Sequence, residues 1–302
     1  MSDNKKAITA ILLANFFFGT NVIAVKQITP GIVSPLGLTT LRIVGAAILF
    51  WIFFGYKKSV QVFSTKDVLL LVCCAIAGIS LNQALSIKGI SLTSPIHASL
   101  LILTTPISIS LLAAIFLKEK LSRFKIIGLI LGVAGGALLI FSRDLSAINR
   151  GNQAMGDFYV ILSALCYSTY VLLMKPLASK FQNLIILKWV FLIGSIITLP
   201  IGYADLVLIK WSSFNFTTWF CLFYIVIGAT FLAYFFMNYG ISKIGASPTS
   251  SFMYSQPFFA AIAAIMILNE SISLPKIIAA TLIFAGVYIA NKPNNTHKIA
   301  EG

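Results

Sequence analysis

The sequence has few charged residues and lacks the side-chain groups of a metal or catalytic centre. Only 10% of its residues are charged, eight of them are carboxylates, and the chain has two histidines. The four cysteines, Cys73, Cys74, Cys166 and Cys221, fall in apolar stretches without metal-ligand spacing, so neither a disulfide framework nor a metal site is expected. With no carboxylate pair in an apolar stretch, most intramembrane enzyme chemistry is excluded, and no cofactor is expected.

Long hydrophobic runs take up most of the chain instead. Hydrophobic residues make up 59% of the sequence, and the mean hydropathy is +0.96. A helix of about 20 apolar residues crosses the roughly 30 Å hydrocarbon core of a bilayer. Ten such runs can be placed, at residues 7–25, 35–54, 67–87, 93–117, 124–141, 157–174, 184–203, 217–239, 246–268 and 275–291. The sequence therefore predicts an all-α integral membrane protein with ten transmembrane helices.

Lysine and arginine are distributed unevenly over the two sides of these runs. With the N-terminus inside, fifteen fall on the inner side and six on the outer side, while Arg42 lies within the second run. Because positive residues are retained on the cytoplasmic face, both termini are expected to be cytoplasmic. The net charge of +14 comes from short loops without an aromatic-basic platform, so no nucleic-acid partner is expected.

Two parts of the chain are similar to each other. Residues 89–137 align with residues 240–288 at an offset of 151. Residues 19–26 align with residues 168–175 at an offset of 149, which is shorter by two residues. The matched pairs are Pro106 and Pro257, Thr104 and Ser255, Thr105 and Gln256, Glu119 and Glu270, and Lys26 and Lys175. We infer a tandem duplication with halves at residues 1–145 and 146–302. Five helices per half place the second copy in the inverted orientation, a pattern typical of transporters.

Short motifs recur at equivalent places in the two halves. The first half has Asn-Gln-Ala-Leu at 82–85, a Ser-Pro helix start at 94–95, Pro106, Leu-Lys-Glu at 117–119 and a Gly-rich fifth helix. The second has Gly-Ala-Thr-Phe-Leu-Ala-Tyr at 228–234, Pro257, Leu-Asn-Glu at 268–270 and Gly-Val-Tyr at 286–288. These motifs resemble the EamA-type family of the drug/metabolite transporter superfamily.

The resemblance implies a multi-pass carrier of the bacterial inner membrane that works by alternating access. Its substrates would be small organic metabolites such as amino acids, amines or related compounds, with efflux favoured. The resemblance also implies a central cavity lined mainly by helices other than the fifth and tenth. Membrane lipid would surround a monomer or a homodimer.

The two matched prolines are candidate kink residues. Pro106 and Pro257 lie near the middle of their predicted helices, and each follows polar residues. A proline leaves the backbone carbonyl one turn earlier without its donor. Matched interruptions in an inverted repeat indicate a binding site near the midplane of the membrane. The alternative is a structural kink whose polar neighbours only satisfy backbone groups.

Polar and aromatic side chains within the predicted helices need a partner or water, so they are expected to face the bundle interior. The candidate substrate-binding residues are Asn15, Asn21, Arg42, Asn82, Gln83, His97, Thr104, Thr105, Tyr167, Tyr170, Trp189, Tyr234, Asn238, Tyr254 and Gln256. Packing between helices is the alternative for each. For Arg42 three roles stay open: binding a ligand carboxylate, pairing with backbone carbonyls, and snorkelling to the headgroups.

The ionisable residues suggest how the carrier would be gated. All eight carboxylates are expected at helix ends or in loops, which predicts a facilitator or exchanger, or one that uses His97 to handle protons. A structural role is the alternative for His97. Lys26 and Lys175 are candidate gate cations at opposite mouths, or else anchors of helix ends. Glu119 and Glu270 are candidate gate residues on opposite faces.

Glycines at positions 128, 132 and 136 allow another helix to approach the fifth helix closely, within the bundle or in a dimer. The competing functional class is a non-transporting membrane receptor or assembly protein. Matched prolines within an inverted repeat favour a carrier over that alternative.

Overall fold

Every regular element in the described part of the computed structural model is a helix. The structure describes residues 3–29, 31–55, 62–116, 123–141, 150–244, 252–269 and 273–290. The elements are α1 (Asp3–Ile28), α2 (Pro35–Phe54), α3 (Thr65–Cys74), η1 (Ala75–Leu81), α4 (Asn82–Leu92), α5 (Pro95–Ile102), α6 (Thr105–Phe116), α7 (Arg123–Phe141), α8 (Arg150–Ala178), α9 (Asn183–Val207), η2 (Trp211–Ser213), α10 (Phe216–Phe223), η3 (Tyr224–Leu232), α11 (Ala233–Ile244), η4 (Phe252–Ser255), α13 (Gln256–Leu268) and α14 (Leu274–Ala290). The segments α3–η1–α4 and α10–η3–α11 each form one uninterrupted helix.

Seven helices among the described residues are long and apolar enough to cross a membrane. They are Asn4–Ile28, Pro35–Phe54, Thr65–Leu92, Pro95–Phe116, Asn152–Ala178, Asn183–Val207 and Phe216–Ile244. Shorter apolar helices cover Ile126–Gly135, Gln256–Leu268 and Leu274–Gly286. All ten predicted runs fall on these helices, so the chain is a multi-pass transmembrane protein. The number of spans and the side on which the termini lie remain predictions.

Several helices extend beyond the predicted runs because polar residues continue them past the apolar stretch. The helices at residues 65–92, 150–178 and 216–244 replace the predicted 67–87, 157–174 and 217–239. Caps in the sequence fix other starts. Ser34 and Ser94 each precede a proline at the first helical position, and each hydroxyl accepts the N–H three residues later. Ser64 and Asp67 form a capping box at the start of α3.

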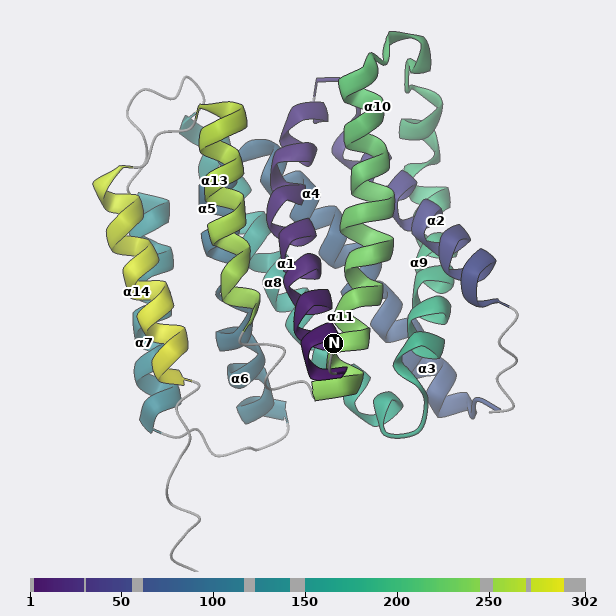
Figure 1. Ribbon diagram of the computed structural model, residues 1–302, viewed down its shortest axis with the longest axis horizontal. Coiled ribbons are helices and arrows are strands. Elements are labelled where there is room, and N and C mark those ends of the chain that lie inside the picture. Colours follow the sequence, from purple (N-terminus) through teal and green to yellow (C-terminus); the bar gives the residue numbers. More distant parts are fainter. Residues whose placement is uncertain are drawn as a thin grey trace, which may run out of the picture.

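The two halves of the chain interlock. The most extensive contacts pair α7 with α14, α2 with α9, α4 with α8, and α1 with both α11 and α13. Each pair joins a helix of residues 1–145 to one of residues 146–302. Figure 1 shows α7 and α14 together at one edge of the bundle, with α1 near its middle. A Cβ on Gly286 of α14 would lie 2.7 Å from the carbonyl oxygen of Gly128 on α7, and one on Gly132 would overlap Ile107 Cδ1, so Gly128 and Gly132 lie at close contacts within the bundle.

Each half has one π-helical segment and one break before its proline. The π-helical segments are η1 and η3, and the breaks are the turn at residues 103–104 and the 3₁₀ helix η4. Each break lies just before the proline at which the sequence predicted an interrupted helix. Pro106 and Pro257 are the second residues of α6 and α13, where the N–H that proline lacks would have no intrahelical partner anyway.

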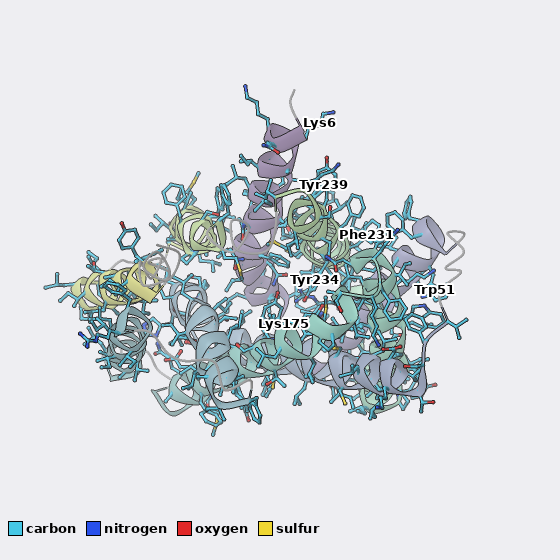
Figure 2. All side chains as sticks on the ribbon, turned by 90° about the horizontal axis from the view of Figure 1, so that it is seen from below. Lys6, Trp51, Lys175, Phe231, Tyr234 and Tyr239 are labelled. Atoms are coloured by element: carbon cyan, nitrogen blue, oxygen red, sulfur yellow. The ribbon has the colours of Figure 1, made fainter. Side chains whose placement is uncertain are left out.

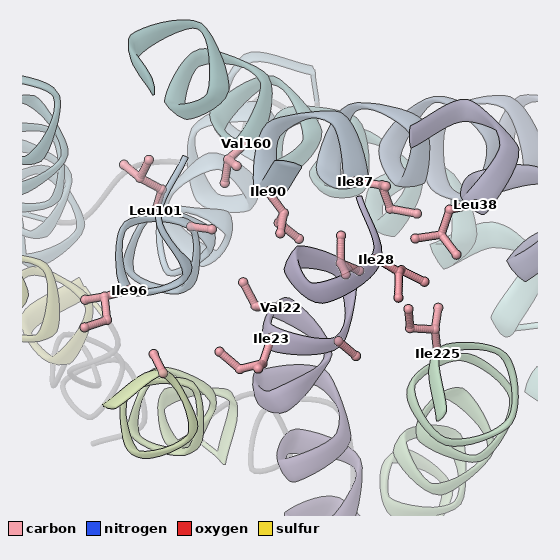
Figure 3. Close-up of a cluster of buried hydrophobic side chains, with 14 of the residues drawn as sticks. Val22, Ile23, Ile28, Leu38, Ile87, Ile90, Ile96, Leu101, Val160 and Ile225 are labelled. Atoms are coloured by element: carbon pink, nitrogen blue, oxygen red, sulfur yellow. The ribbon is translucent and has the colours of Figure 1, made fainter. Parts of the chain in front are cut away.

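The two ends of the bundle are packed differently. We call the end where α1 ends and α5 begins the Lys26 end, and the opposite end, where α8 ends, the Lys175 end. At the Lys26 end one apolar cluster joins residues of α1, α4, α5, α8 and η3, among them Ile28, Ile90, Leu101, Val160 and Ile225 (Figure 3). A second cluster packs α2, α3, α8 and α9 together and includes the fully buried Phe50 and Phe191.

Candidate functional site

A cavity of about 410 Å³ lies between the two halves. Helices α1, α2, α4, α5, α6, α8, α9, α11 and α13 all contribute to its walls. Candidate residues from the sequence that line it are Asn21, Arg42, Asn82, Gln83, Thr105, Tyr167, Tyr170, Tyr234, Asn238 and Gln256. Seen from the Lys175 end, Tyr234 and Lys175 lie toward the centre of the bundle, whereas Trp51 lies at its edge (Figure 2).

Arg42 supplies a buried positive charge at the cavity wall. Its side chain is buried on α2; Nε donates to the Thr230 hydroxyl at 2.8 Å and Nη2 to the Ala229 carbonyl at 3.4 Å. Both acceptors belong to the π-helical segment η3, where the Thr230 hydroxyl in turn donates to the Ile225 carbonyl. No carboxylate among the described residues forms an ion pair with Arg42. The guanidinium is thus positioned by the protein while its charge is left unbalanced.

Gln83 and Tyr234 occupy equivalent places in the two halves and both line the cavity. Each is the second residue after a π-helical segment. Gln83 is buried, and neither its amide nitrogen nor its amide oxygen has a hydrogen-bond partner within the described residues. A buried amide without partners costs about 1–3 kcal/mol per group. Such an amide at a cavity wall is a potential contact for a polar ligand.

The asparagines of the cavity differ in how far the protein satisfies them. Asn82 donates to the Ser163 carbonyl at 2.8 Å, and Asn238 donates to the Tyr234 carbonyl at 2.8 Å. Asn21 is buried, and its side-chain oxygen has no donor among the described residues. Asn21 and Gln83 together leave one donor and two acceptors at the cavity without a protein partner.

The two helix breaks are held by equivalent contacts from the first helix of each half. The carbonyl oxygen of Gln256 would lie 2.5 Å from a Cβ on Gly19 of α1, so only glycine fits there. The matched contact is made by Ser168 of α8, whose hydroxyl oxygen lies 3.3 Å from the Thr105 carbonyl oxygen and 2.7 Å from the Ala164 carbonyl oxygen, so that its one proton is shared between them. Gln256 also donates through its amide to the Asn15 side-chain oxygen at 2.8 Å.

The hydroxyl beside Pro106 satisfies the carbonyl that the proline leaves without a donor. Thr105 Oγ1 donates to the Ile102 carbonyl at 2.6 Å, and Thr104 Oγ1 donates to the Leu101 carbonyl at 2.7 Å. This is the structural role that the sequence left open for these hydroxyls. Thr105 lines the cavity as well, whereas Thr104 does not belong to its walls.

Other candidate residues lie away from the cavity. Asn15 is buried behind it and bonded to Gln256, and the Trp189 ring packs against Trp51 and Phe63. The side chains of Pro106 and Tyr254 and the residues Glu119 and Glu270 lie outside the part of the chain that the structure describes. Their roles as kink, substrate-binding and gate residues remain predictions.

Polar contacts fasten the Lys26 end. The Lys26 ammonium on α1 donates to the carbonyls of Ser91 and Thr93, at 3.1 and 2.8 Å. The Thr93 hydroxyl donates to Asp157 of α8. His97 Nδ1 on α5 lies 3.4 Å from Asp157 Oδ2 and 3.3 Å from Gln153 Nε2. We call Thr93, His97, Gln153 and Asp157 the His97 cluster; all four side chains are buried.

Asp157 corrects the expectation that every carboxylate lies at a helix end or in a loop. The polar stretch at residues 150–156 continues α8 for two turns before the apolar run begins, so Asp157 is the eighth residue of the helix. Its side chain is 1% exposed. A hydropathy profile places Asp157 at the edge of the apolar run and does not show that the helix begins earlier. The spacing of Gln153 and Asp157, four residues apart, was the available sign that both side chains lie on one face of a helix.

Lys175 has a different environment. It lies in the last turn of α8, is exposed, and lines the cavity together with Ala178 and Asn183. Asp157 precedes it by eighteen residues, or about 27 Å along the helix axis. The cavity therefore reaches surface residues at the Lys175 end, while the apolar cluster and the His97 cluster cover the Lys26 end. Among the described residues no group of His, Cys, Asp and Glu is arranged to hold a metal ion.

The chain is similar to known proteins along nearly its whole length. The model of the EamA-like transporter family matches residues 5–141 and again residues 154–292. The uncharacterized transporter YetK of Bacillus subtilis (strain 168) is 22% identical over 283 residues, covering 94% of this chain and 86% of that protein.

More distant organisms hold similar proteins as well. An uncharacterized transporter of Archaeoglobus fulgidus is 26% identical over 273 residues, covering 90% of this chain and 94% of that protein. A WAT1-related chloroplastic protein of Arabidopsis thaliana is 23% identical over 292 residues, with 94% and 69% covered. A solved crystal structure superposes with a TM-score of 0.61 at 18% identity and covers 96% of both chains, which supports the fold.

Proposed function

Since the chain belongs to the EamA-like transporter family of the drug/metabolite transporter superfamily, we propose that it carries small organic metabolites across the membrane by alternating access. The ligand would be an amphipathic metabolite with a carboxylate group, such as an amino acid or a related organic acid. The protein would act as a carrier and not as an enzyme. Export from the cytoplasm is the direction we propose.

The observation that carries this proposal is the unbalanced charge of Arg42 at the wall of the cavity. A guanidinium offers several donors in a planar fork that matches a carboxylate, and two of its nitrogens are already bonded to η3. The carboxylate of a ligand would balance the charge without moving the side chain. Organic cations would be repelled by the same group.

The remaining walls suit the rest of such a ligand. Tyr167, Tyr170 and Met174 supply apolar and aromatic surface on α8, and Asn21 and Gln83 supply hydrogen-bonding groups without partners. The volume of about 410 Å³ lies within the roughly 300–1,000 Å³ of ligand pockets in general. A group that donates hydrogen bonds would reach Asn21, which favours a zwitterion or a hydroxy acid.

The paired interruptions support alternating access. Each half has one break with a residue beside it at the cavity wall, Thr105 in one half and Gln256 in the other, and such irregular backbone in a membrane is tolerated where it lines a cavity. The π-helical segments end just before the cavity residues Asn82 and Tyr234. We propose that the two halves 1–145 and 146–302 are inverted repeats that rock about these breaks. Closing the Lys175 end while opening the Lys26 end would then expose the ligand on the other side.

The charge bias of the loops predicts which end of the cavity faces the cytoplasm. With both termini in the cytoplasm, the Lys175 end faces the cytoplasm and the Lys26 end faces outward. The cavity reaches exposed residues at the Lys175 end. A ligand would thus load from the cytoplasm in this conformation.

Counterflow in liposomes that contain the purified protein tests the proposal. Vesicles are loaded with pooled amino acids, organic acids, nucleotides or amines, and uptake of labelled members of each pool is followed. We expect saturable exchange with the carboxylate-bearing pools and none with the amines. Exchange of amines alone would contradict the role of Arg42, and no exchange from any pool by well-folded protein would contradict the carrier function.

The variant Arg42→Gln is the sharpest test of the binding site. Loss of a charge-assisted contact costs about 1.5–3 kcal/mol, so the apparent affinity for the exchanged ligand should fall at least about tenfold. Lys188→Gln is the matched control, because Lys188 is also a buried cation but lies over the Trp51 ring and away from the cavity. The control should keep its affinity. Equal losses in both variants would argue against a ligand contact at Arg42.

A further inference from the structure

The His97 cluster has no part in the cavity, yet it joins two helices that line it. His97 lies on α5, and Gln153 and Asp157 lie on α8. We propose that this cluster binds a proton, and that the protonated form holds the Lys26 end of the protein closed. The proposal rests on the carrier function proposed above, because the closing of one end matters only in a protein that alternates.

The first step is the position of His97 Nδ1 between two groups that need opposite forms of the ring. Asp157 Oδ2 at 3.4 Å can only accept a hydrogen bond, whereas the Gln153 amide nitrogen at 3.3 Å can only donate one. An unprotonated Nδ1 accepts from Gln153 and leaves Asp157 unpaired on that side. A protonated Nδ1 donates to Asp157 instead. The two arrangements exclude each other at one nitrogen. The neutral ring can donate from Nδ1 as well, but only the ring with a proton on both nitrogens is a cation, so the proton-bound state is the one that forms an ion pair with Asp157.

The second step concerns Nε2, the other ring nitrogen of His97. His97 Nε2 is buried and has no partner within the described residues. Nδ1 is thus the ring nitrogen through which His97 contacts other described side chains. Histidine is also the side chain whose charge changes between about pH 5 and pH 8.

The third step is the charge around the pair. The charged side chains described on the neighbouring elements at this end are Lys26 on α1, Lys88 on α4, Asp205 on α9 and Lys276 on α14. The Lys26 ammonium donates to the Thr93 carbonyl, and the Thr93 hydroxyl donates to Asp157. The Asp157 carboxylate thus accepts a hydrogen bond from Thr93 on one oxygen and faces His97 with the other, so a proton held on His97 would form an ion pair with it.

The fourth step is the link to movement. Helix α5 has only eight residues, and the turn at 103–104 separates it from α6. Ile102 at the end of α5 and Ser163 and Ala164 of α8 line the cavity. An ion pair between His97 and Asp157 therefore fastens a short hinged helix to α8 directly above the cavity. Loss of the proton removes the ion pair and lets α5 separate from α8.

The test uses a cysteine at Val25, a fully buried residue of the apolar cluster at the Lys26 end that does not line the cavity. The protein carries Val25→Cys with its four native cysteines replaced by alanine, and is placed in lipid nanodiscs, where both ends are accessible. A polar maleimide is added between about pH 5.5 and pH 8. Each labelling rate is divided by the rate for the same protein unfolded in detergent at that pH, which removes the pH dependence of the thiol.

We expect the corrected labelling rate to be at least about tenfold lower at the acidic end of this range, as the loss of a charge-assisted hydrogen bond implies. His97→Gln should make the rate independent of pH, and Asp157→Asn should leave it high throughout. His297→Gln, a change at the only other histidine of the chain, should behave as the parent. A parent rate that does not depend on pH, or a dependence that persists in folded His97→Gln protein, would overturn the proposal.

No transported substrate enters this measurement, so the two proposals can fail separately. A pH-dependent labelling rate without counterflow of any pool would contradict the proposed carrier function but support the proposed proton site. Counterflow together with a labelling rate that does not change with pH would contradict the proposed proton site but support the proposed carrier function. If the Asp157→Asn protein fails to fold, the comparison of His97→Gln with His297→Gln still tests whether the pH dependence arises from His97.

Discussion

Lys26 and Lys175 are matched residues of the two halves, but they lie at opposite ends of the bundle in unlike surroundings. The Lys26 ammonium is bonded to the carbonyls of Ser91 and Thr93, next to the His97 cluster. Lys175 is exposed at the wall of the cavity. The duplication has thus kept the position of the cation and changed its contacts. One end is fastened by polar groups, and the other leads into the cavity.

The same contrast holds at the helix breaks. In each half, the break before the proline is contacted by the first helix of the other half: Gly19 lies against the break at Gln256, and Ser168 lies against the break at Thr105. The side chains at the breaks make different hydrogen bonds. Thr105 donates to the Ile102 carbonyl of the preceding helix, whereas Gln256 donates to the Asn15 side chain on α1. The backbone of the repeat is shared because both halves must bend in the same way. The side chains have diverged because each half faces a different partner.

The largest expected effect comes from forcing the Lys26 end apart. A Cβ on Gly156 would lie 2.8 Å from the Thr93 nitrogen and 2.9 Å from the Gly89 carbonyl oxygen, so Gly156→Leu must separate α4 from α8. Such overpacking should lower the free energy of unfolding by up to about 3 kcal/mol. Gly31→Leu is the control, because nothing lies within 4 Å of a Cβ there. Thermal unfolding in one detergent checks both, and equal losses would contradict the close packing.

Neutralising the two matched lysines tests the contrast directly. Lys26→Gln removes a charged donor from two carbonyls and should lower the free energy of unfolding by about 1.5 kcal/mol. Lys175→Gln changes an exposed side chain and should cost less than about 0.5 kcal/mol. Midpoints of thermal unfolding in the same detergent measure the difference. A larger loss for Lys175→Gln would reverse our assignment of the fastened end.

The residues at the two breaks should also differ in their effect on stability. Gln256→Leu leaves the buried Asn15 oxygen without a donor and should cost about 1 kcal/mol. Thr105→Val removes only a hydrogen bond within the same chain segment and should cost about 0.5 kcal/mol. Chemical unfolding followed by tryptophan fluorescence compares the two variants. Restored stability in an Asn15→Leu, Gln256→Leu double variant would support the pairing, and purely additive losses would argue against it.

The smallest effect on stability is expected at the matched cavity residues Gln83 and Tyr234. Gln83→Leu removes two unpaired buried polar groups, so the free energy of unfolding should stay within about 0.5 kcal/mol of the parent or rise. The affinity for the exchanged ligand should nevertheless fall by about tenfold if Gln83 binds it. Tyr234→Phe keeps the ring and should weaken binding less. A stability loss in Gln83→Leu without a change in affinity would assign Gln83 to packing.

The sequence predicted the helical regions well because the signal for each lies within one stretch of chain. Apolar runs and caps such as Ser34 and Ser94 are local, and the charge bias needs no knowledge of packing. It failed where a helix continues through polar residues, as before Asp157. The matched prolines predicted an interruption, but they did not show whether each proline bends one helix or begins a new one.

The candidate site was predicted in part. Ten of the candidate substrate-binding residues line one cavity, because polar groups in a membrane helix bundle turn inward. Trp189 does not, because an aromatic ring packs equally well against Trp51 between helices. The role of Thr230 in holding Arg42 and of Asp157 in facing His97 could not be read from spacing, since each pair comes from different helices.

The sequence by itself determined that this is a helical transmembrane protein of duplicated sequence, because hydrophobic length and the need to satisfy every backbone group inside the bilayer act within single segments. Only the tertiary structure decided which polar groups meet: Arg42 with Thr230, Asn15 with Gln256, and His97 with Asp157. Those contacts depend on how each helix is rotated and shifted against its neighbours. That arrangement is set by the packing of many side chains at once, at sites such as Gly19 against the backbone of Gln256.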